Sequence, residues 1–230
     1  MLEELKAQVC KANLDLVRHG LVTLTWGNVS GFDRASKLAV IKPSGVAYDS
    51  MKPEQMVVVD LEGNVVEGSL RPSSDTPTHV LLYKHFSNVN GITHTHSTHA
   101  TTFAQARREI PCFGTTHADH FYGPVPVTRP LTAREVDEAY EANTGLVILD
   151  AFKNRSPDSM PAVLVAGHAP FAWGKDAATS VKNAVALEAV AQMALGTLAL
   201  NPNPTLLETY VLDKHHNRKH GPGAYYGQKT

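Results

Sequence analysis

Short β-rich runs interleaved with long helical patterns are the feature that most restricts the folds open to this chain. Between residues 22 and 68 the runs VTLTWGNVS, LAVIKPSG and MVVVDLEGNVVEG alternate with Gly, Asp, Asn and Ser turns, which is typical of antiparallel strands. Further strands are predicted at GITHTH, around the loop GTTHAD and at PAVLVAGH. A chain of 230 residues is long enough for one core and short for two. The sequence therefore predicts a single α/β domain over residues 1–230, with a central antiparallel or mixed sheet flanked by helices.

Four helices are predicted from apolar periodicity and from their end signals. Residues 2–19 carry apolar side chains at helical spacing. The segment SSDTPTHVLLYKHF offers Ser74 or Asp75 as an N-cap, and LTAREVDEAYEANTG is predicted to end at Gly145. The fourth helix, DAATSVKNAVALEAVAQMALGTLAL, has an apolar face and ends before the NPNP breaker.

Charge and cysteine content narrow the class of partner. The formal net charge is −1, and Lys and Arg concentrate only in HHNRKHG, so we expect small molecules rather than nucleic acid or a membrane as partners. The N-terminus is charged from its third residue and no run approaches the length of a bilayer span, so we expect a cytoplasmic protein. Cys10 and Cys112 lie outside any CxxC pattern and are predicted to be reduced, partly buried thiols.

Histidines are the unusual component of this sequence. The chain has 12, and three of them fall within six residues of the stretch GITHTHSTHA. If GITHTH is a strand, His94 and His96 project to one face about 6.6 Å apart and can converge on one ion. His168 follows the β-patterned run PAVLVAGH and is suited to be a third ligand, although spacing alone does not make it one. Three histidines with an open fourth position describe a catalytic site for zinc or another divalent cation.

Two features of this metal hypothesis have ordinary alternatives. Histidines in a strand also occur as simple hydrogen-bonded residues. Asp75 could complete the metal shell or hold a ligand, but an Asp at the mouth of a helix is also a common N-cap.

Three short segments, TWGNVSG, KPSG and RPSSD, are candidates for binding a phosphate. Their small residues let the backbone approach an anion closely, and the third opens a predicted helix, whose N-terminus attracts negative charge. Each segment alone is equally typical of a turn, so the prediction depends on whether the three converge. The candidate donors, with one lysine as the nearby cation, are Gly27, Asn28, Ser44, Gly45, Ser73, Ser74 and Lys42.

Seven motifs together resemble a known family. The segments WGNVS, IKPSGV, PSSDTPTH, HTHSTHA, GTTHADHFYG, HAPFAWG and the tail DKHHNRKHGPGAYYGQ occur in order over essentially the whole chain. They are similar to those of the L-ribulose-5-phosphate 4-epimerases, a family of the class II aldolase and adducin-head superfamily. The resemblance implies a central antiparallel sheet flanked by helices, and a cyclic homotetramer with active sites between neighbouring subunits.

The resemblance also implies a role for particular residues. His94, His96 and His168 would hold zinc with Asp75 beside it. The acid/base pair would be Asp119 and, from the tail of an adjacent subunit at about 213–230, Tyr226. The substrate phosphate would be bound by Asn28, Ser44, Gly45, Ser73 and Ser74 with Lys42 close by, and His215 matches a further active-site position. His216 departs from the family's tail motif, which has a tyrosine at this position.

The reaction implied by the resemblance explains these residue types. Inverting carbon four of L-ribulose 5-phosphate to give D-xylulose 5-phosphate cannot begin at the proton on that carbon, which is not next to the carbonyl. Retro-aldol cleavage between carbons three and four, rotation of the aldehyde and re-addition achieve the inversion. A Lewis acid is wanted where negative charge develops, and two proton-transfer groups are wanted for the two faces. Arabinose and ascorbate-type catabolism both use this reaction.

Two rival functions remain open at this stage. An aldolase acting on a sugar phosphate such as L-fuculose 1-phosphate would use the same cleavage, but that branch carries Glu where this chain has Asp75. A non-catalytic module like the adducin head would share the fold without the metal ligands. For Asp119 and Tyr226 the ordinary alternatives are a loop carboxylate bonded to backbone and a frayed C-terminus.

Overall fold

The computed structural model describes residues 1–226, so the last four residues of the predicted tail, 227–230, lie outside the described part of the chain. One seven-stranded sheet has the order β4-β3-β2-β1-β5-β7-β6, and every neighbouring pair is antiparallel. The predicted α/β fold on an antiparallel sheet is therefore confirmed. The strands are β1 (Asn28–Asp33), β2 (Leu38–Ile41), β3 (Val57–Val59), β4 (Val65–Glu67), β5 (Gly91–His94), β6 (Ala162–Leu164) and β7 (Pro170–Gly174).

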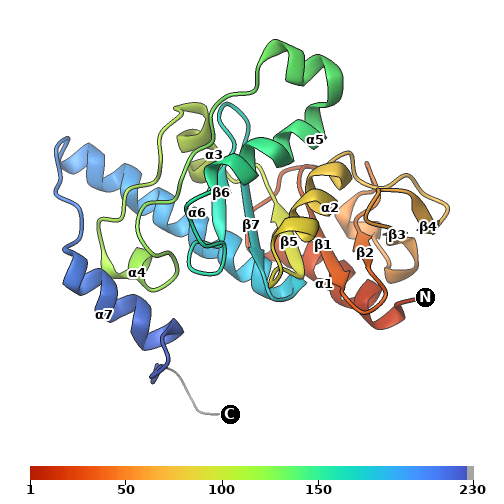
Figure 1. Ribbon diagram of the computed structural model, residues 1–230, viewed down its shortest axis with the longest axis horizontal. Coiled ribbons are helices and arrows are strands. Elements are labelled where there is room, and N and C mark those ends of the chain that lie inside the picture. Colours follow the sequence, from red (N-terminus) through yellow and green to blue (C-terminus); the bar gives the residue numbers. More distant parts are fainter. Residues whose placement is uncertain (227–230) are drawn as a thin grey trace.

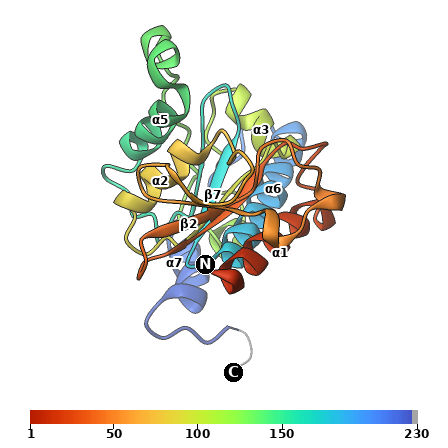
Figure 2. The same cartoon turned by 90° about the vertical axis from the view of Figure 1, so that its right-hand side faces the viewer.

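Helices cover both faces of the sheet. In Figure 2, α1 and α6 lie on one side of the strands, and α2 and α5 lie on the other. Helix α7 packs beside the short α4 at one end of the molecule, away from α2 and α5 (Figure 1). The helices are α1 (Glu3–Arg18), α2 (Thr76–His85), α3 (Thr98–Gln105), α4 (Thr115–Ala118), α5 (Ala133–Ala151), α6 (Ala177–Leu200) and α7 (Thr209–His220), with 3-10 turns η1 (Tyr48–Ser50) and η2 (Pro53–Gln55).

The core joins the sheet to both helical layers. Strand β3 is three buried valines, and α6 packs against β5 and β7 along its buried face. On the opposite face, Ser30 of β1 is hydrogen bonded to both His79 and Tyr83 of α2. These buried polar contacts fix how α2 lies on the sheet, and α2 leads directly from one of the phosphate-type turns.

Four expectations about individual elements are wrong. Helix α5 does not end at Gly145 but continues to Ala151. A Cβ at Gly145 would lie 2.7 Å from Leu81 Cδ2, so this glycine allows close packing of α5 on α2 rather than a helix end. The loop around GTTHAD forms helix α4 instead of strands, and β5 ends at His94, leaving His96 beyond the strand.

The fourth wrong expectation is that no apolar run approaches the length of a bilayer span. Helix α6 has 24 residues and a stretch with a mean hydropathy of 1.4, enough in length and composition to cross a membrane. Core helices of globular domains have the same properties, and α6 contacts strands of the sheet. The buried face of α6 therefore packs against the sheet.

Helix α5 has a kink that the sequence pattern did not predict. Ala139 has φ −167° and ψ 77°, which is extended backbone inside the helix. Across the kink, Asn143 Nδ2 donates a hydrogen bond of 2.7 Å to the carbonyl oxygen of Glu135. The kink turns the residues that follow it, Tyr140 and Glu141, toward the cavity described below.

A substitution at Gly91 tests the contact between the sheet and α6. An added Cβ would overlap the backbone of Asp176 and Ala177, which form the start of α6 and cannot move alone. We expect Gly91→Ala to lower the free energy of unfolding by roughly 3 kcal/mol, at the upper end of overpacking effects. Urea denaturation measures it. Gly196→Ala, which meets no atom within 4 Å, is the control and should be neutral or slightly stabilising.

Candidate metal and phosphate site

One cavity of about 390 Å³ gathers the predicted metal-binding and phosphate-binding residues. It opens where β1 begins and β5 ends, because Asn28 pairs with His94 and His94 pairs with Phe171 across the sheet. Residues far apart in the sequence therefore meet at one sheet edge. The predicted residues that line it are Gly27, Asn28, Lys42, Ser44, Gly45, Ser73, Ser74, Asp75, His94, His96 and His168.

Three imidazoles converge inside this cavity. The possible ligand atoms of His94, His96 and His168 all lie within 4.8 Å of one another. The Nε2 atoms of His94 and His96 are 3.2 Å apart, although His96 lies two residues beyond the strand. His168 reaches the group from the turn between β6 and β7. This spacing allows all three side chains to coordinate a single ion.

Hydrogen bonding and burial leave these imidazoles in the form that binds metals. His94 Nδ1 donates to the carbonyl oxygen of Pro170 at 2.9 Å, which leaves Nε2 free to act as a ligand. Burial, reinforced by the neighbouring histidines, lowers the pKa of His168 to about 4 and also lowers the pKa of His96. The buried Nδ1 of His168 has no hydrogen-bond partner within residues 1–226. The three-nitrogen donor set fits zinc with an open coordination position.

Asp75 lies beside the histidines rather than capping a helix. It occupies the N-cap position of α2, but its side chain makes no capping bond. Its Oδ2 instead accepts a hydrogen bond of 2.7 Å from Asn28 Nδ2 and lies 4.0 Å from His94 Nε2. Burial raises the pKa of Asp75, but His94, His79 and the bond from Asn28 outweigh it, so the pKa lies below its ordinary value. The carboxylate is thus ionised next to the candidate metal position.

Backbone pairing brings the phosphate-type turns together. The N–H of Ser44 donates to the carbonyl of Arg71, and the N–H of Ser73 donates to that of Lys42. The turns KPSG and RPSSD consequently lie side by side. The third turn approaches β5 so closely that a Cβ on Gly27 would lie 2.8 Å from the carbonyl oxygen of His94, and Gly27 has φ +83°. The three segments therefore do converge, as the phosphate hypothesis requires.

Lys42 supplies a buried positive charge at these turns. Its residue is only 2% exposed, and Nζ donates to the carbonyl of Pro43 at 3.3 Å and lies 5.0 Å from the centre of the Tyr48 ring. Burial lowers the pKa of Lys42. Among the described residues no carboxylate pairs with it, so a bound anion would satisfy this ammonium group.

Two further residues of the cavity were missed by sequence reasoning. Tyr140 and Glu141 follow the kink in α5 and line the cavity beside His168. The rings of Tyr140 and His168 have centroids 6.0 Å apart. The segment EAYEANTG reads as an uninterrupted helix, and the sequence contains no signal for the extended Ala139 that turns Tyr140 inward.

Asp119 lies in a different place, in a cluster with helix α7. It accepts hydrogen bonds from Arg218 Nε at 3.1 Å and Nη2 at 2.7 Å, and from His215 Nδ1 at 3.1 Å. Lys219 Nζ lies 3.4 Å away. Partial burial raises the pKa of Asp119, but the bonds from Arg218 and His215 and the charge of Lys219 lower it to about 2. We call these four residues the Asp119 cluster.

Tyr226 belongs beside the Asp119 cluster rather than beside the histidines of its own chain. Its ring lies 4.8 Å from the guanidinium carbon of Arg218 and 4.4 Å from Lys219 Nζ, and the residue is 60% exposed. Neither Asp119 nor Tyr226 lines the metal cavity formed by residues 1–226. A single chain thus keeps the histidines apart from the predicted acid/base residues, and we refer to these two groups as half-sites, after the shared active site that the resemblance implies.

Arg218 makes two of the hydrogen bonds that join α7 to the body of the protein. We expect Arg218→Met to lower the hydrogen-exchange protection of α7 amides several-fold, because it removes the two hydrogen bonds that this side chain donates to Asp119. Asp119 has a pKa below its unfolded value, so this stabilisation is present above about pH 4 and is lost as the pH falls toward 2. Hydrogen exchange with mass spectrometry measures it. Arg134→Met, which removes only an exposed pair with Glu138, is the control, and equal protection in both variants would contradict the assignment.

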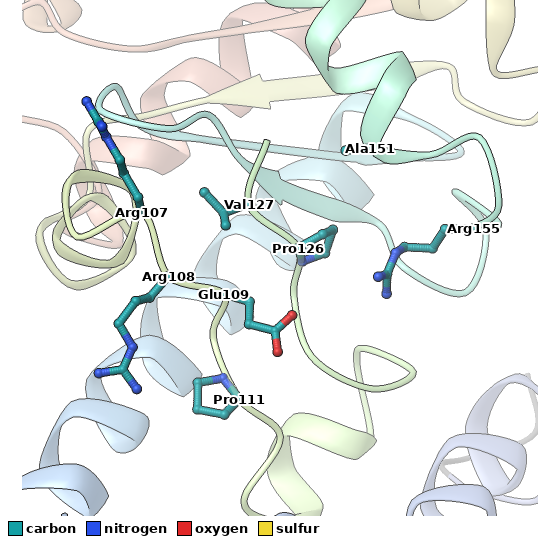
Figure 3. A pocket seen from close by; sticks show the side chains of 8 residues that line it. All are labelled: Arg107, Arg108, Glu109, Pro111, Pro126, Val127, Ala151 and Arg155. Carbon is teal, nitrogen blue, oxygen red and sulfur yellow. The ribbon is translucent and has the colours of Figure 1, made fainter. Parts of the chain in front are cut away.

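A larger cavity, of about 560 Å³, contains none of the predicted site residues. Figure 3 shows the side chains of Arg107, Arg108, Glu109 and Arg155 around it, with Arg108 and Arg155 on opposite sides. All four residues are exposed. Within residues 1–226 the cavity has no grouping of metal ligands, so the chemistry of this chain is better sought at the histidines.

Comparison with known proteins gives a consistent result over most of the chain. A family model described as Class II Aldolase and Adducin N-terminal domain matches residues 7–195. Among solved structures, an L-fuculose 1-phosphate aldolase is 26% identical with a TM-score of 0.82, covering 94% of this chain and 95% of its own.

Two further solved structures share the fold. The L-fuculose 1-phosphate aldolase of Glaciozyma antarctica PI12 is 18% identical with a TM-score of 0.78, covering 94% of this chain and 81% of its own. The L-fuculose-1-phosphate aldolase of Thermus thermophilus is 24% identical with a TM-score of 0.67, covering 88% of this chain and 98% of its own.

Proposed function

We propose that this chain is a metal-dependent sugar-phosphate epimerase. It belongs to the class II aldolase and adducin family, and the proposal starts from that membership. The reaction would interconvert L-ribulose 5-phosphate and D-xylulose 5-phosphate by retro-aldol cleavage and re-addition. The observation that carries the proposal is the joint lining of one cavity by three histidines, a buried lysine and two serine-rich turns. A metal at one end and an anion at the other is what a phosphorylated hydroxyketone requires.

One group of residues in the cavity would bind the phosphate and another would bind the metal. Lys42 and the backbone and hydroxyl groups of Ser44, Gly45, Ser73 and Ser74 would hold the phosphate while the bond between carbons three and four is open. His94, His96 and His168 would hold zinc, with Asp75 beside it. Bound there, zinc would act as a Lewis acid and stabilise negative charge on substrate oxygens. The tether of the phosphate keeps the aldehyde in place while it presents its other face.

Proton transfer would come from the second half-site. Asp119 and Tyr226 lie outside the metal cavity of their own chain, so they would act on the cavity of a neighbouring copy. This arrangement requires an oligomer, and we propose the homotetramer that the resemblance implies. Two proton-transfer groups, one for each face of the aldehyde, suit an inversion better than a simple cleavage.

The second candidate function is a sugar-phosphate aldolase. It is favoured by the 26% identity to an L-fuculose 1-phosphate aldolase over nearly the whole of both chains. Against it stands Asp75, in place of the Glu that follows the paired serines in that branch, and the tail motif AYYGQ of the epimerase pattern. The shorter carboxylate also accepts a hydrogen bond of 2.7 Å from Asn28.

An aldolase assay separates the two functions. Zinc-loaded protein is incubated with L-fuculose 1-phosphate, and free dihydroxyacetone phosphate and lactaldehyde are quantified. The epimerase proposal predicts negligible release at enzyme concentrations that convert L-ribulose 5-phosphate. Stoichiometric release of both fragments would overturn it in favour of the aldolase, and metal-free, inactive protein would favour the scaffold function. We further propose a cytoplasmic location and a place in arabinose or ascorbate-type catabolism.

A further inference from the structure

Tyr140 lines the metal cavity from a hydrogen-bonded segment of backbone. Thr144 Oγ1 donates to the carbonyl of Tyr140 at 2.9 Å, and Thr78 Oγ1 donates to the carbonyl of Glu141 at 2.6 Å. The extended Ala139 before it breaks the helix, and Asn143 bridges that break. Hydrogen bonds therefore hold the backbone on both sides of the kink, and Tyr140 lines the cavity from this segment.

The Tyr140 hydroxyl also differs from the hydroxyls of the fully buried phenols. Tyr48 donates to the carbonyls of Trp26 and Gly27, and Tyr83 bonds Ser30. No residue in the described chain, 1–226, forms a hydrogen bond with the Oη of Tyr140. A half-buried phenol in a polar cavity without a protein partner is available to a ligand.

The position of the ring indicates which part of a ligand it meets. Its centroid lies 6.0 Å from that of His168, at the histidine end of the cavity, and the residue lines the same space as Asp75. The phosphate-type turns lie on segments before α2, whereas Tyr140 comes from α5. A ligand with its phosphate at the turns and its carbonyl and hydroxyl oxygens at the histidines would therefore have these oxygens near the Tyr140 ring.

We infer that Tyr140 is a substrate-positioning residue, whose hydroxyl donates a hydrogen bond to an oxygen of the hydroxyketone end of a bound sugar phosphate. The inference rests on the proposed sugar-phosphate function and holds for the epimerase and for the aldolase alike. It assigns Tyr140 no proton transfer, which stays with Asp119 and Tyr226. What it adds is recognition of the unphosphorylated part of the ligand by a residue of the same chain as the histidines.

Calorimetric titration of the zinc-loaded protein tests this assignment with two probes. Dihydroxyacetone phosphate carries both a hydroxyketone and a phosphate, and inorganic phosphate carries only the second. We expect Tyr140→Phe to weaken binding of dihydroxyacetone phosphate roughly 3- to 10-fold, the effect of one net hydrogen bond, while leaving inorganic phosphate and zinc content unchanged. Tyr210→Phe is the matched control, because Tyr210 is 74% exposed and lies on α7, and it should bind both probes like the wild type.

The other possible outcomes of this titration contradict either the role of Tyr140 or the proposed function. Unchanged binding of dihydroxyacetone phosphate by Tyr140→Phe removes Tyr140 from the ligand contacts and leaves the proposed function standing. Equal weakening of both probes, or loss of zinc, shows a general structural role and overturns the inference as well. If the wild type binds neither probe, the sugar-phosphate function itself fails and the inference fails with it.

Discussion

His94→Asn will remove bound zinc and epimerase activity together. His94 is buried at the end of β5, bonded through Nδ1 to Pro170, and its Nε2 faces the other two imidazoles. With two of three protein ligands left, we expect zinc affinity to fall by more than about 100-fold, because losing even an outer-shell partner costs roughly 10- to 100-fold. Activity should fall in proportion to the metal lost. Metal analysis after dialysis and an assay on the same sample measure both quantities.

Two further substitutions make this prediction specific. His96→Asn alters a side chain that lies beyond β5 and is less buried than His94, so it should lose zinc with less risk to folding. His85→Asn is the control, because His85 is exposed on α2 and bonds only the carbonyl of Leu81. Full retention of zinc by both His94→Asn and His96→Asn would remove these residues from the ligand set.

We expect Tyr226→Phe to lower the turnover number strongly and to leave the zinc content unchanged. The side chain lies beside Arg218 and Lys219 and away from the histidines of its own chain, so its loss cannot disturb the zinc ligands directly. A positioned acid/base group contributes about 100- to 10,000-fold in rate, and we expect a loss within that range. Turnover number and zinc content of the purified variant check both statements. Wild-type turnover would show that this tyrosine is only an exposed end.

Mixing two inactive variants tests whether the two half-sites act between subunits. His94→Asn subunits keep an intact Tyr226, and Tyr226→Phe subunits keep an intact metal cavity. Unfolding and refolding them together should restore activity that neither variant shows alone, because some cavities would be completed by a neighbour's tail. No recovery in assemblies shown to be mixed would place both half-sites on one chain.

The sheet and the longest helices could be predicted because local patterns specify them. The apolar runs of β2 and β3 and the apolar face of α6 are visible in the sequence, and Asp176 caps α6 through the N–H of Thr179. Of the run VTLTWGNVS, only the last three residues belong to a strand, because β1 begins at Asn28. Cys10 and Cys112 are free and buried, as expected from their isolation in the sequence.

Elements that depend on distant contacts could not be predicted. Gly145 looked like a helix end, but its position requires a small residue because the Leu81 side chain packs against it. Leu81 lies on a different helix, far away in the sequence. The kink at Ala139 has no local signal. Helix α7 is mostly polar and charged, and it is held by Asp119, which no periodicity reveals.

The site was predictable in residue type but not in arrangement. A histidine pair in HTH and serine-rich turns are visible in the sequence, whereas their convergence depends on the register of β1 against β5 and on the pairing of Ser73 with Lys42. The expected strand geometry for His96 is wrong because β5 ends at His94, but the ring still reaches its partner at 3.2 Å. Tertiary packing, rather than strand alternation, positions this side chain.

The most direct test of the central claim follows carbon signals by NMR while zinc-loaded protein acts on L-ribulose 5-phosphate. The account predicts growth of D-xylulose 5-phosphate to an equilibrium mixture, without accumulation of dihydroxyacetone or glycolaldehyde phosphate. Absence of the xylulose product from protein that holds zinc would contradict the epimerase assignment.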